Sequence, residues 1–257
     1  MDLNEQWVAF CTILRKEIKR FTRIWIQTLI PPAITMALYF VIFGQLIGSR
    51  IGSMDGFSYL QFVAPGLIMM AVLTNSYSNV VSSFFSAKYQ RSVEEILVSP
   101  TPNYIILLGY TIGGVARGLA VGFLVTLLSL AFTDLHIHSW FMTVSVVILT
   151  SMLFSLAGFI NAVYANSFDD ISIVPTFVLT PLTYLGGVFY SISLLPEFWQ
   201  GVSQLNPILY MVNAFRYGIL GISDVDVLGA FAGLLVGVII LFMVGLFLLK
   251  NGKRLRA

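Results

Sequence analysis

The chain has 257 residues, of which 58% are hydrophobic and only 10% are charged, and its formal net charge is +2. A soluble domain carries about 25% charged residues, so 14 basic and 12 acidic side chains are too few to cover a soluble globule of this length. The composition favours a membrane protein and argues against a soluble enzyme, a disordered chain or a nucleic-acid-binding protein.

The N-terminal segment 1–26 predicts an amphipathic helix ahead of the first membrane segment. Its apolar residues recur every three or four positions, close to the helical period of 3.6: Leu3, Trp7, Phe10, Leu14, Ile18, Phe21 and Trp25. Basic residues flank this stripe: Arg15, Lys16, Lys19, Arg20 and Arg23. Such a helix lies among the lipid headgroups, so membrane lipid is a predicted partner. It is either a topology anchor alone or also a contact for a cytoplasmic protein.

Six apolar segments are long enough to cross a bilayer as helices. A bilayer core of about 30 Å needs roughly 20 helical residues, and backbone groups in lipid must be hydrogen-bonded within their own segment. None of the six carries Asp or Glu in its interior. The segments are 27–48, 59–83, 109–132, 140–164, 171–190 and 227–249.

A further apolar stretch, 194–222, predicts two short re-entrant helices on the external side of the membrane. Pro207 lacks a backbone donor and disfavours helix at Asn206, so one continuous crossing is not expected. Arg216 and Gly201 also interrupt the stretch.

The distribution of basic residues predicts that both termini are cytoplasmic. With six crossings, only Arg50 and Arg216 lie on the far side of the membrane. The near side holds the five basic residues of segment 1–26 together with Lys88, Arg91, Lys250, Lys253, Arg254 and Arg256. Cytoplasmic loops carry the excess of Lys and Arg in membrane proteins.

The loop after the second membrane segment predicts a short cytoplasmic helix, 86–98, stopped by Pro100 and Pro102. An apolar face with Val93 and Ile96 accompanies charged groups, including Arg91 and Glu95 at a spacing of four. A solvated connector is one interpretation. A helix that docks on a partner protein is the other, because a connector does not require an apolar stripe. The candidate docking residues are Lys88, Tyr89, Gln90, Arg91, Glu94, Glu95 and Leu97.

Polar side chains inside the membrane segments are candidates for a translocation pathway. Asn75, Asn79 and Ser83 share one face of the second segment, and Arg117 lies about two turns into the third. Hydrogen bonds between helices would also explain the first three, and a side chain reaching towards the headgroups would explain Arg117.

We expect no metal, cofactor or catalytic residue in this chain. His136 and His138 are fewer ligands than a zinc site needs. The sequence also lacks the G-x-x-x-x-G-K-[ST] pattern that cradles nucleotide phosphates.

Four stretches together resemble the permease subunits of bacterial type-2 ATP-binding-cassette (ABC) exporters, and the resemblance covers nearly the whole chain. They are the N-terminal amphipathic segment, 95–102 with 106–109, 186–190 with Leu195 and Pro196, and Leu-Asn-Pro-Ile-Leu-Tyr at 205–210 with Arg216. The last two stretches are the most specific. Tyr110 departs from the pattern, because lysine is common there in the family.

The resemblance implies a homodimer of six-helix subunits and two copies of a separate cytoplasmic ABC ATPase. It implies that 86–98 is the coupling helix that docks on the ATPase. The re-entrant helices would form the external gate, with Pro196, Asn206, Pro207 and Arg216 within it. ATP hydrolysis would belong to the partner, and the transported substrate stays open.

We therefore predict an all-α membrane protein, a single transmembrane domain over 1–257 that serves as the permease of an ATP-driven exporter in a bacterial inner membrane. The alternative is a stand-alone secondary transporter or channel. That class needs a coupling carboxylate or a ring of charges at membrane depth, and the six segments contain neither. A neighbouring gene for an ATPase with the phosphate-cradling pattern would favour the exporter.

Overall fold

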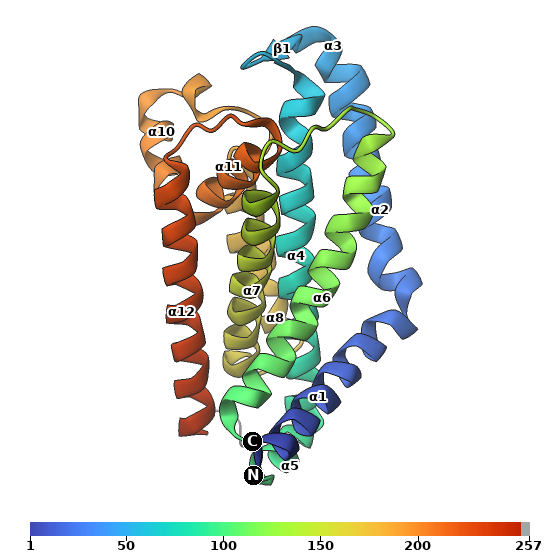
Figure 1. Cartoon of the computed structure of the whole chain (residues 1–257), viewed down its shortest axis with the longest axis vertical. Helices are drawn as coiled ribbons and strands as arrows, with labels where there is room; N and C mark the ends of the chain where they lie inside the picture. Colours follow the sequence, from blue (N-terminus) through green and yellow to red (C-terminus); the bar gives the residue numbers. More distant parts are fainter. Residues whose placement is uncertain (253–257) are drawn as a thin grey trace.

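The computed structural model describes residues 1–252, which form a bundle of long helices (Figure 1). Three of the basic residues used in the orientation argument, Lys253, Arg254 and Arg256, lie outside the described residues. The chain begins with α1 (Leu3–Arg23), which runs obliquely at one end of the bundle. Helix α2 (Trp25–Val41) follows after a break at Ile24, whose φ of −112° and ψ of 37° are not helical.

Helix α2 continues to the other end of the bundle through a π-helical stretch (Ile42–Ile47) and α3 (Gly48–Ile51). A small antiparallel hairpin follows, formed by β1 (Ser53–Met54) and β2 (Phe57–Ser58). Its turn uses positive backbone φ angles, 50° at Asp55 and 85° at Gly56. Sequence reasoning did not predict this hairpin.

Among the described residues, five helical stretches are long and apolar enough to cross a membrane: Trp25–Ile51, Tyr59–Tyr89 (α4), Asn103–Leu130 (α6), Trp140–Tyr164 (α7) and Val227–Asn251 (α12). Each overlaps one predicted membrane segment, and α7 has the predicted bounds. The chain is thus an all-α membrane protein. Helices α4 and α6 extend beyond the predicted segments at the end where α1 lies.

The segment predicted as 171–190 is shorter and less regular than expected. Helix α8 (Asp170–Val174) leads into a π-helical stretch (Pro175–Leu179) and then α9 (Thr180–Tyr184). Pro175 and Pro181 lie within this run, and each lacks the N–H that a regular α-helix uses. The helical run ends at Tyr184, and irregular backbone, with a positive φ of 67° at Gly187, continues to 190.

Contacts at both ends of α4 establish that this irregular segment runs the length of the bundle. At one end, Lys88 Nζ donates to the carbonyl oxygens of Val163 and Ala165, at 2.7 and 2.8 Å. At the other end, the Tyr59 hydroxyl donates to the Phe189 carbonyl oxygen at 3.0 Å. Tyr59 and Lys88 are roughly 44 Å apart along α4 at 1.5 Å per residue.

Two short helices follow a 3-10 turn (Ile192–Leu194) at the hairpin end of the bundle: α10 (Glu197–Gln204) and α11 (Pro207–Leu220). The Asn206 side chain caps α11, accepting a hydrogen bond from Ile208 N at 3.0 Å. Pro207 occupies the first turn of α11, where its missing N–H has no helical partner to lose.

Helix α4 lies at the centre of the core and packs between α6 and α7. The Phe84 ring lies 4.3 Å from that of Phe159 and 5.2 Å from that of Tyr110, centroid to centroid. Glycine permits the close approach of these helices, because a Cβ at Gly118 would overlap the Ser76 hydroxyl.

Candidate functional sites

The predicted helix 86–98 is divided in the structure. Helix α4 runs to Tyr89, the chain turns at Gln90 and Arg91, and a separate helix α5 covers Ser92–Val98. Arg91 has a left-handed φ of 61° and precedes the first turn of α5. The spacing of Arg91 and Glu95 predicted that they share one face of a continuous helix. They do not, because Arg91 lies in the turn before α5.

Helix α5 has an inner and an outer face. Val93 is buried, and Leu97 and Ile96 pack against the core cluster. Glu95 and Val98 are exposed, the latter at 84%. Val98 was missed by sequence reasoning, although its place three residues after Glu95 puts both on the same face of the helix. The inner face fixes α5 to the bundle and leaves the outer face open.

The residues before α5 divide in the same way. Tyr89, Gln90 and Arg91 are exposed. Lys88 is directed inward, and its ammonium group contacts the last carbonyl oxygens of α7. A cation is favoured at a helix C-terminus, so Lys88 braces α4 against α7. Of the seven candidate docking residues, Tyr89, Gln90, Arg91 and Glu95 are exposed, Glu94 is half-buried, and Lys88 and Leu97 make contacts within the chain.

The loop beside Lys88 is ordered by Asp170. Its carboxylate accepts hydrogen bonds from the backbone N–H groups of Asn166 and Ser167, at 2.8 and 3.2 Å, and from the Ser167 hydroxyl at 2.8 Å. These donors, with the positive charge of Lys88, hold the pKa of Asp170 below its ordinary value.

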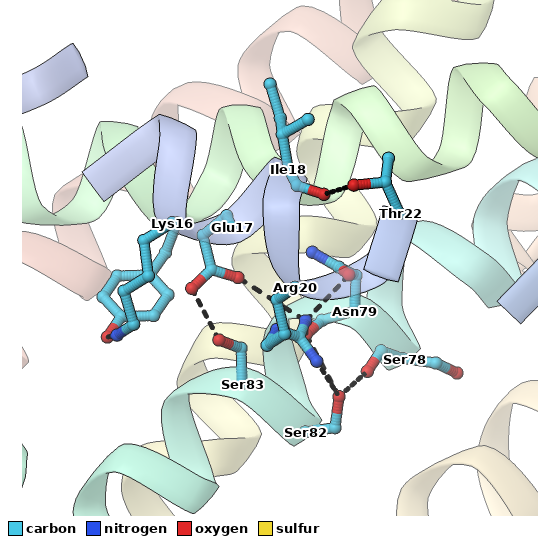
Figure 2. A network of polar contacts seen from close by, with 10 residues as sticks. Lys16, Glu17, Ile18, Arg20, Thr22, Ser78, Asn79, Ser82 and Ser83 are labelled. Carbon is cyan, nitrogen blue, oxygen red and sulfur yellow. Dashed lines mark hydrogen bonds and ion pairs between the residues drawn. The ribbon is translucent and has the colours of Figure 1, made fainter. Parts of the chain in front are cut away.

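A buried polar network joins α1 to α4, and Figure 2 shows it from close by. Ser83 Oγ donates to Glu17 Oε1 at 2.6 Å, and Arg20 Nη2 lies 3.5 Å from Glu17 Oε2. Arg20 Nη2 also donates to the carbonyl oxygen and to Oδ1 of Asn79, both at 2.8 Å. Among the described residues, Glu17 is the only buried acidic side chain.

Sequence reasoning missed Glu17, although a signal was present. Glu17 is three residues after Leu14 and four before Phe21, so it interrupts the apolar stripe of α1. The structure leaves Leu3, Trp7 and Ile18 of the stripe exposed. Ile13 and Glu17 are the residues that face the glycines of α6, and a Cβ at Gly113 would lie 2.5 Å from Glu17 Cβ. Glycine on α6 therefore lets the carboxylate reach α4.

The four predicted pathway residues fall into two groups: Asn75 and Arg117 contact each other, and Asn79 and Ser83 contact α1. Arg117 Nη2 donates to Asn75 Oδ1 at 3.1 Å, so the structure brings these two together. Asn79 and Ser83 are instead covered by Glu17 and Arg20 of α1. All four make contacts within the chain, and only Arg117 is more than slightly exposed.

The open face of α4 consists of different residues from those predicted. Thr74 is exposed, and Ser78, Ser82 and Ser86 are half-buried, each four positions after the one before. The hydroxyl groups of Thr74 and Ser82 donate to backbone carbonyl oxygens one turn back, at 2.8 and 2.7 Å. A strip of hydroxyl groups thus faces outward on the helix that otherwise forms the core.

At the other end of the bundle, Arg216 is buried and ties three segments together. Its Nη2 donates to the Gly187 carbonyl oxygen at 2.6 Å, and its Nε donates to the Phe62 carbonyl oxygen at 3.3 Å. Its Nη1 donates to Asn213 Oδ1 at 3.3 Å, and its guanidinium carbon lies 3.9 Å from the centre of the Phe62 ring. Gly187 has a φ of 67°, which suits glycine.

The four predicted gate residues have two kinds of position. Asn206 and Arg216 are buried and hold neighbouring backbone in place. Pro196 and Pro207 are exposed at the starts of α10 and α11. Within residues 1–252 there is no group of three or more His, Cys, Asp or Glu side chains that could hold a metal ion.

Comparison with known proteins agrees with this arrangement. The family model described as "ABC-2 type transporter" matches residues 8–220. The chain is 60% identical to the inner membrane transport permease YadH of Escherichia coli (strain K12) over 251 residues, 98% of each chain. It is 22% identical to Nodulation protein J of Rhizobium meliloti (strain 1021) over 246 residues, 95% of this chain and 91% of the relative.

The chain belongs to the ABC-2 type transporter family. It is a multi-pass inner-membrane protein and the transmembrane permease subunit of an ABC transporter, a transport component that associates with an ABC ATPase.

Proposed function

We propose that this permease is an exporter driven through α5 by an ABC ATPase bound at the cytoplasmic side. The observation that carries the proposal is the two-sided character of α5. Its inner face, with Val93, packs into the bundle, while Glu95, Val98 and the preceding Arg91 are exposed. A helix fixed in this way transmits a displacement of its outer face to α4.

The energetic requirement is that nucleotide binds two states of the assembly with different affinity. The ATPase supplies that difference, and the permease supplies an element with two positions. Lys88 supports rigid transmission, because it joins the end of α4 to the end of α7 next to α5.

The translocation pathway runs along the open hydroxyl strip of α4, formed by Thr74, Ser78, Ser82 and Ser86. A second copy of this chain covers the strip, giving a homodimer with two ATPase subunits. The strip supports this proposal because, between Ala71 and Ala87, every other residue of α4 is buried within the chain, whereas these four positions are not fully covered.

The chain crosses the membrane six times with both termini in the cytoplasm. Five long helices provide five crossings, and the segment that runs beside α4 from Ala165 to Phe189 provides the sixth. The start of α1, the end of α12 and α5 lie at one end of the bundle in Figure 1, which favours this orientation. Helices α10 and α11 then lie at the external side, where they form the gate.

Site-directed cross-linking tests the docking role of α5. A photoreactive amino acid replaces Glu95 on the exposed face of α5, and a matched variant replaces Glu197, an exposed acidic residue of α10. The chain is co-expressed with its ABC ATPase and irradiated in membranes. We expect a covalent product with the ATPase from position 95 and none from position 197. Equal yields from both positions, or a co-purified pair without any product at 95, would refute docking through α5.

A further inference from the structure

Three cationic side chains and one anionic side chain meet where α1 crosses α4 and α6. Lys16 Nζ lies 3.4 Å from the Tyr110 hydroxyl, and Arg20 and Glu17 form the ion pair described above. Arg117 approaches from α6. It donates to Asn75 Oδ1 at 3.1 Å, and Arg20 donates to Asn79 Oδ1 at 2.8 Å, one turn further along α4. Lys16 is exposed, whereas Arg20 and Arg117 are partly buried. Charge in a poorly solvated setting is unfavourable unless it is compensated, and Glu17 compensates only one of the two arginines.

The same place holds three buried N–H groups without a hydrogen-bond partner. They are Nε of Arg20, Nε of Arg117 and Nδ2 of Asn79. Asn79 is fully buried, and its Oδ1 is already used by Arg20. Buried donors are almost always paired in native proteins, so these three groups indicate an acceptor that the chain itself does not supply.

The buried place opens onto the strip of α4 at the Arg20 side chain. The Arg20 side chain is 27% exposed, and its Nη1 lies 3.5 Å from the Ser82 hydroxyl of that strip. Arg117 is half-buried and lies eight residues inside the predicted membrane segment, which is roughly 12 Å along the helix. The depth corresponds to the inner leaflet in the orientation proposed above.

We propose that Arg20, Arg117 and Asn79 form a binding site for a phosphate group carried by an amphiphilic molecule of the inner leaflet. The excess of one positive charge over Glu17, with the exposed Lys16 nearby, suits the one to two negative charges of a phosphate ester. Guanidinium groups present planar, forked donors that suit phosphate oxygens, and the Asn79 amide adds a neutral donor. The site is independent of ATPase docking, because none of its residues lies in α5 or the turn before it.

Native mass spectrometry of the purified full chain in a neutral detergent tests this site. The probes are dioctanoyl phosphatidic acid, dioctanoyl phosphatidylcholine and inorganic phosphate. We expect phosphatidic acid to bind at least about tenfold more tightly than phosphatidylcholine. Arg20→Gln and Arg117→Gln should each weaken phosphatidic acid binding by about tenfold, as for the loss of a charge-assisted hydrogen bond.

Lys19→Gln is the matched control, since it removes the same charge from an exposed position of α1. We expect it to change phosphatidic acid affinity by less than about twofold, because exposed charges are well screened. Arg20→Lys and Arg117→Lys keep the positive charge but lose the forked donors of the guanidinium group. These variants should bind phosphatidic acid with intermediate affinity. These two variants keep the test decisive if a glutamine variant does not fold.

Two results would overturn the proposal. One is equal affinity for phosphatidic acid and phosphatidylcholine, and the other is an equal loss in Lys19→Gln and the arginine variants. Competition with inorganic phosphate then separates two sources of the same chemistry. Displacement of the lipid supports recognition of the phosphate itself, whereas arginine-dependent lipid binding without displacement supports a phosphate held together with its acyl chains.

Discussion

Arg216 is a structural cross-link at the end of the bundle that holds the hairpin. Its guanidinium group supplies donors to two backbone carbonyl oxygens, at Phe62 and Gly187, and to Asn213. The family resemblance places this residue in the external gate. Its contacts fix the turn at Gly187 to α4 and α11, as the proposed gate requires.

Arg216→Gln should therefore destabilise the protein. The shorter side chain leaves buried acceptors unpaired, which costs about 2–4 kcal/mol of unfolding free energy. Arg50→Gln is the matched control, because Arg50 is exposed near the same end of the bundle and should change stability by less than about 0.5 kcal/mol. Unfolding titrations in mixed micelles measure both. Equal stability of the two variants would contradict the assigned contacts.

The approach of α1 to α6 depends on single glycine positions. A Cβ at Gly113 would lie 2.5 Å from Glu17 Cβ, whereas a Cβ at Gly233 of α12 has nothing within 4 Å. Gly113→Ala should lower the free energy of unfolding by about 1–3 kcal/mol through overpacking. Gly233→Ala should be neutral or stabilising by up to about 1 kcal/mol, from helix propensity alone. A reversed order of stability, measured by the same titration, would show that α1 does not dock as described.

At the residue scale, the sequence identified polar side chains within the membrane segments, but it did not identify all of their hydrogen-bond partners. Asn75 and Arg117 were both selected as polar groups in apolar segments, and the structure pairs them. Asn79 and Ser83 were selected for the same reason, but their partners lie on α1. A pattern along one helix identifies a polar face, whereas only packing reveals which helix covers it.

At the scale of elements, long regular helices were predictable and their junctions were not. The bounds of α7 match because Ser139 caps its first turn and an apolar run follows without interruption. The helix predicted at 86–98 is broken because Arg91 adopts a left-handed conformation. Arginine has no strong intrinsic preference for that conformation, so no local pattern indicated the turn.

The docking of α1 on α6 can be tested as a contact between elements. With Cys11→Ser removing the only cysteine, Gln6→Cys and Tyr104→Cys place thiols at two positions whose side chains meet, since the Tyr104 hydroxyl donates to Gln6 Oε1. A bifunctional thiol reagent about as long as these two side chains should join the pair. It should not join the pair Ile18→Cys and Tyr104→Cys, because Ile18 lies roughly 18 Å from Gln6 along α1. Equal cross-linking of both pairs would contradict the position of α1.

At the scale of the whole molecule, the proposal of six membrane crossings depends on contacts between segments as well as on hydropathy. Composition and helix length identify five membrane-spanning candidates within residues 1–252. The helical run between α7 and α10 ends at Tyr184 and is shorter than the roughly 20 residues of a membrane-spanning helix. The chain from Ala165 to Phe189 nevertheless links the Lys88 end of α4 to the Tyr59 end. Figure 1 shows the start of α1 and the end of α12 at the same end of the bundle, which supports the even number of crossings that we propose.

The central claim is that nucleotide binding by the ATPase moves the open face of α4 through α5. The most direct measurement is the labelling rate of Ser78→Cys, in a Cys11→Ser background, by a membrane-impermeant thiol reagent. The chain is reconstituted with its ATPase and labelled before and after addition of ATP and vanadate. We predict a nucleotide-dependent change in rate that disappears in the Arg91→Glu, Glu95→Lys variant. The same change without the ATPase, or in that variant still bound to it, would contradict the account.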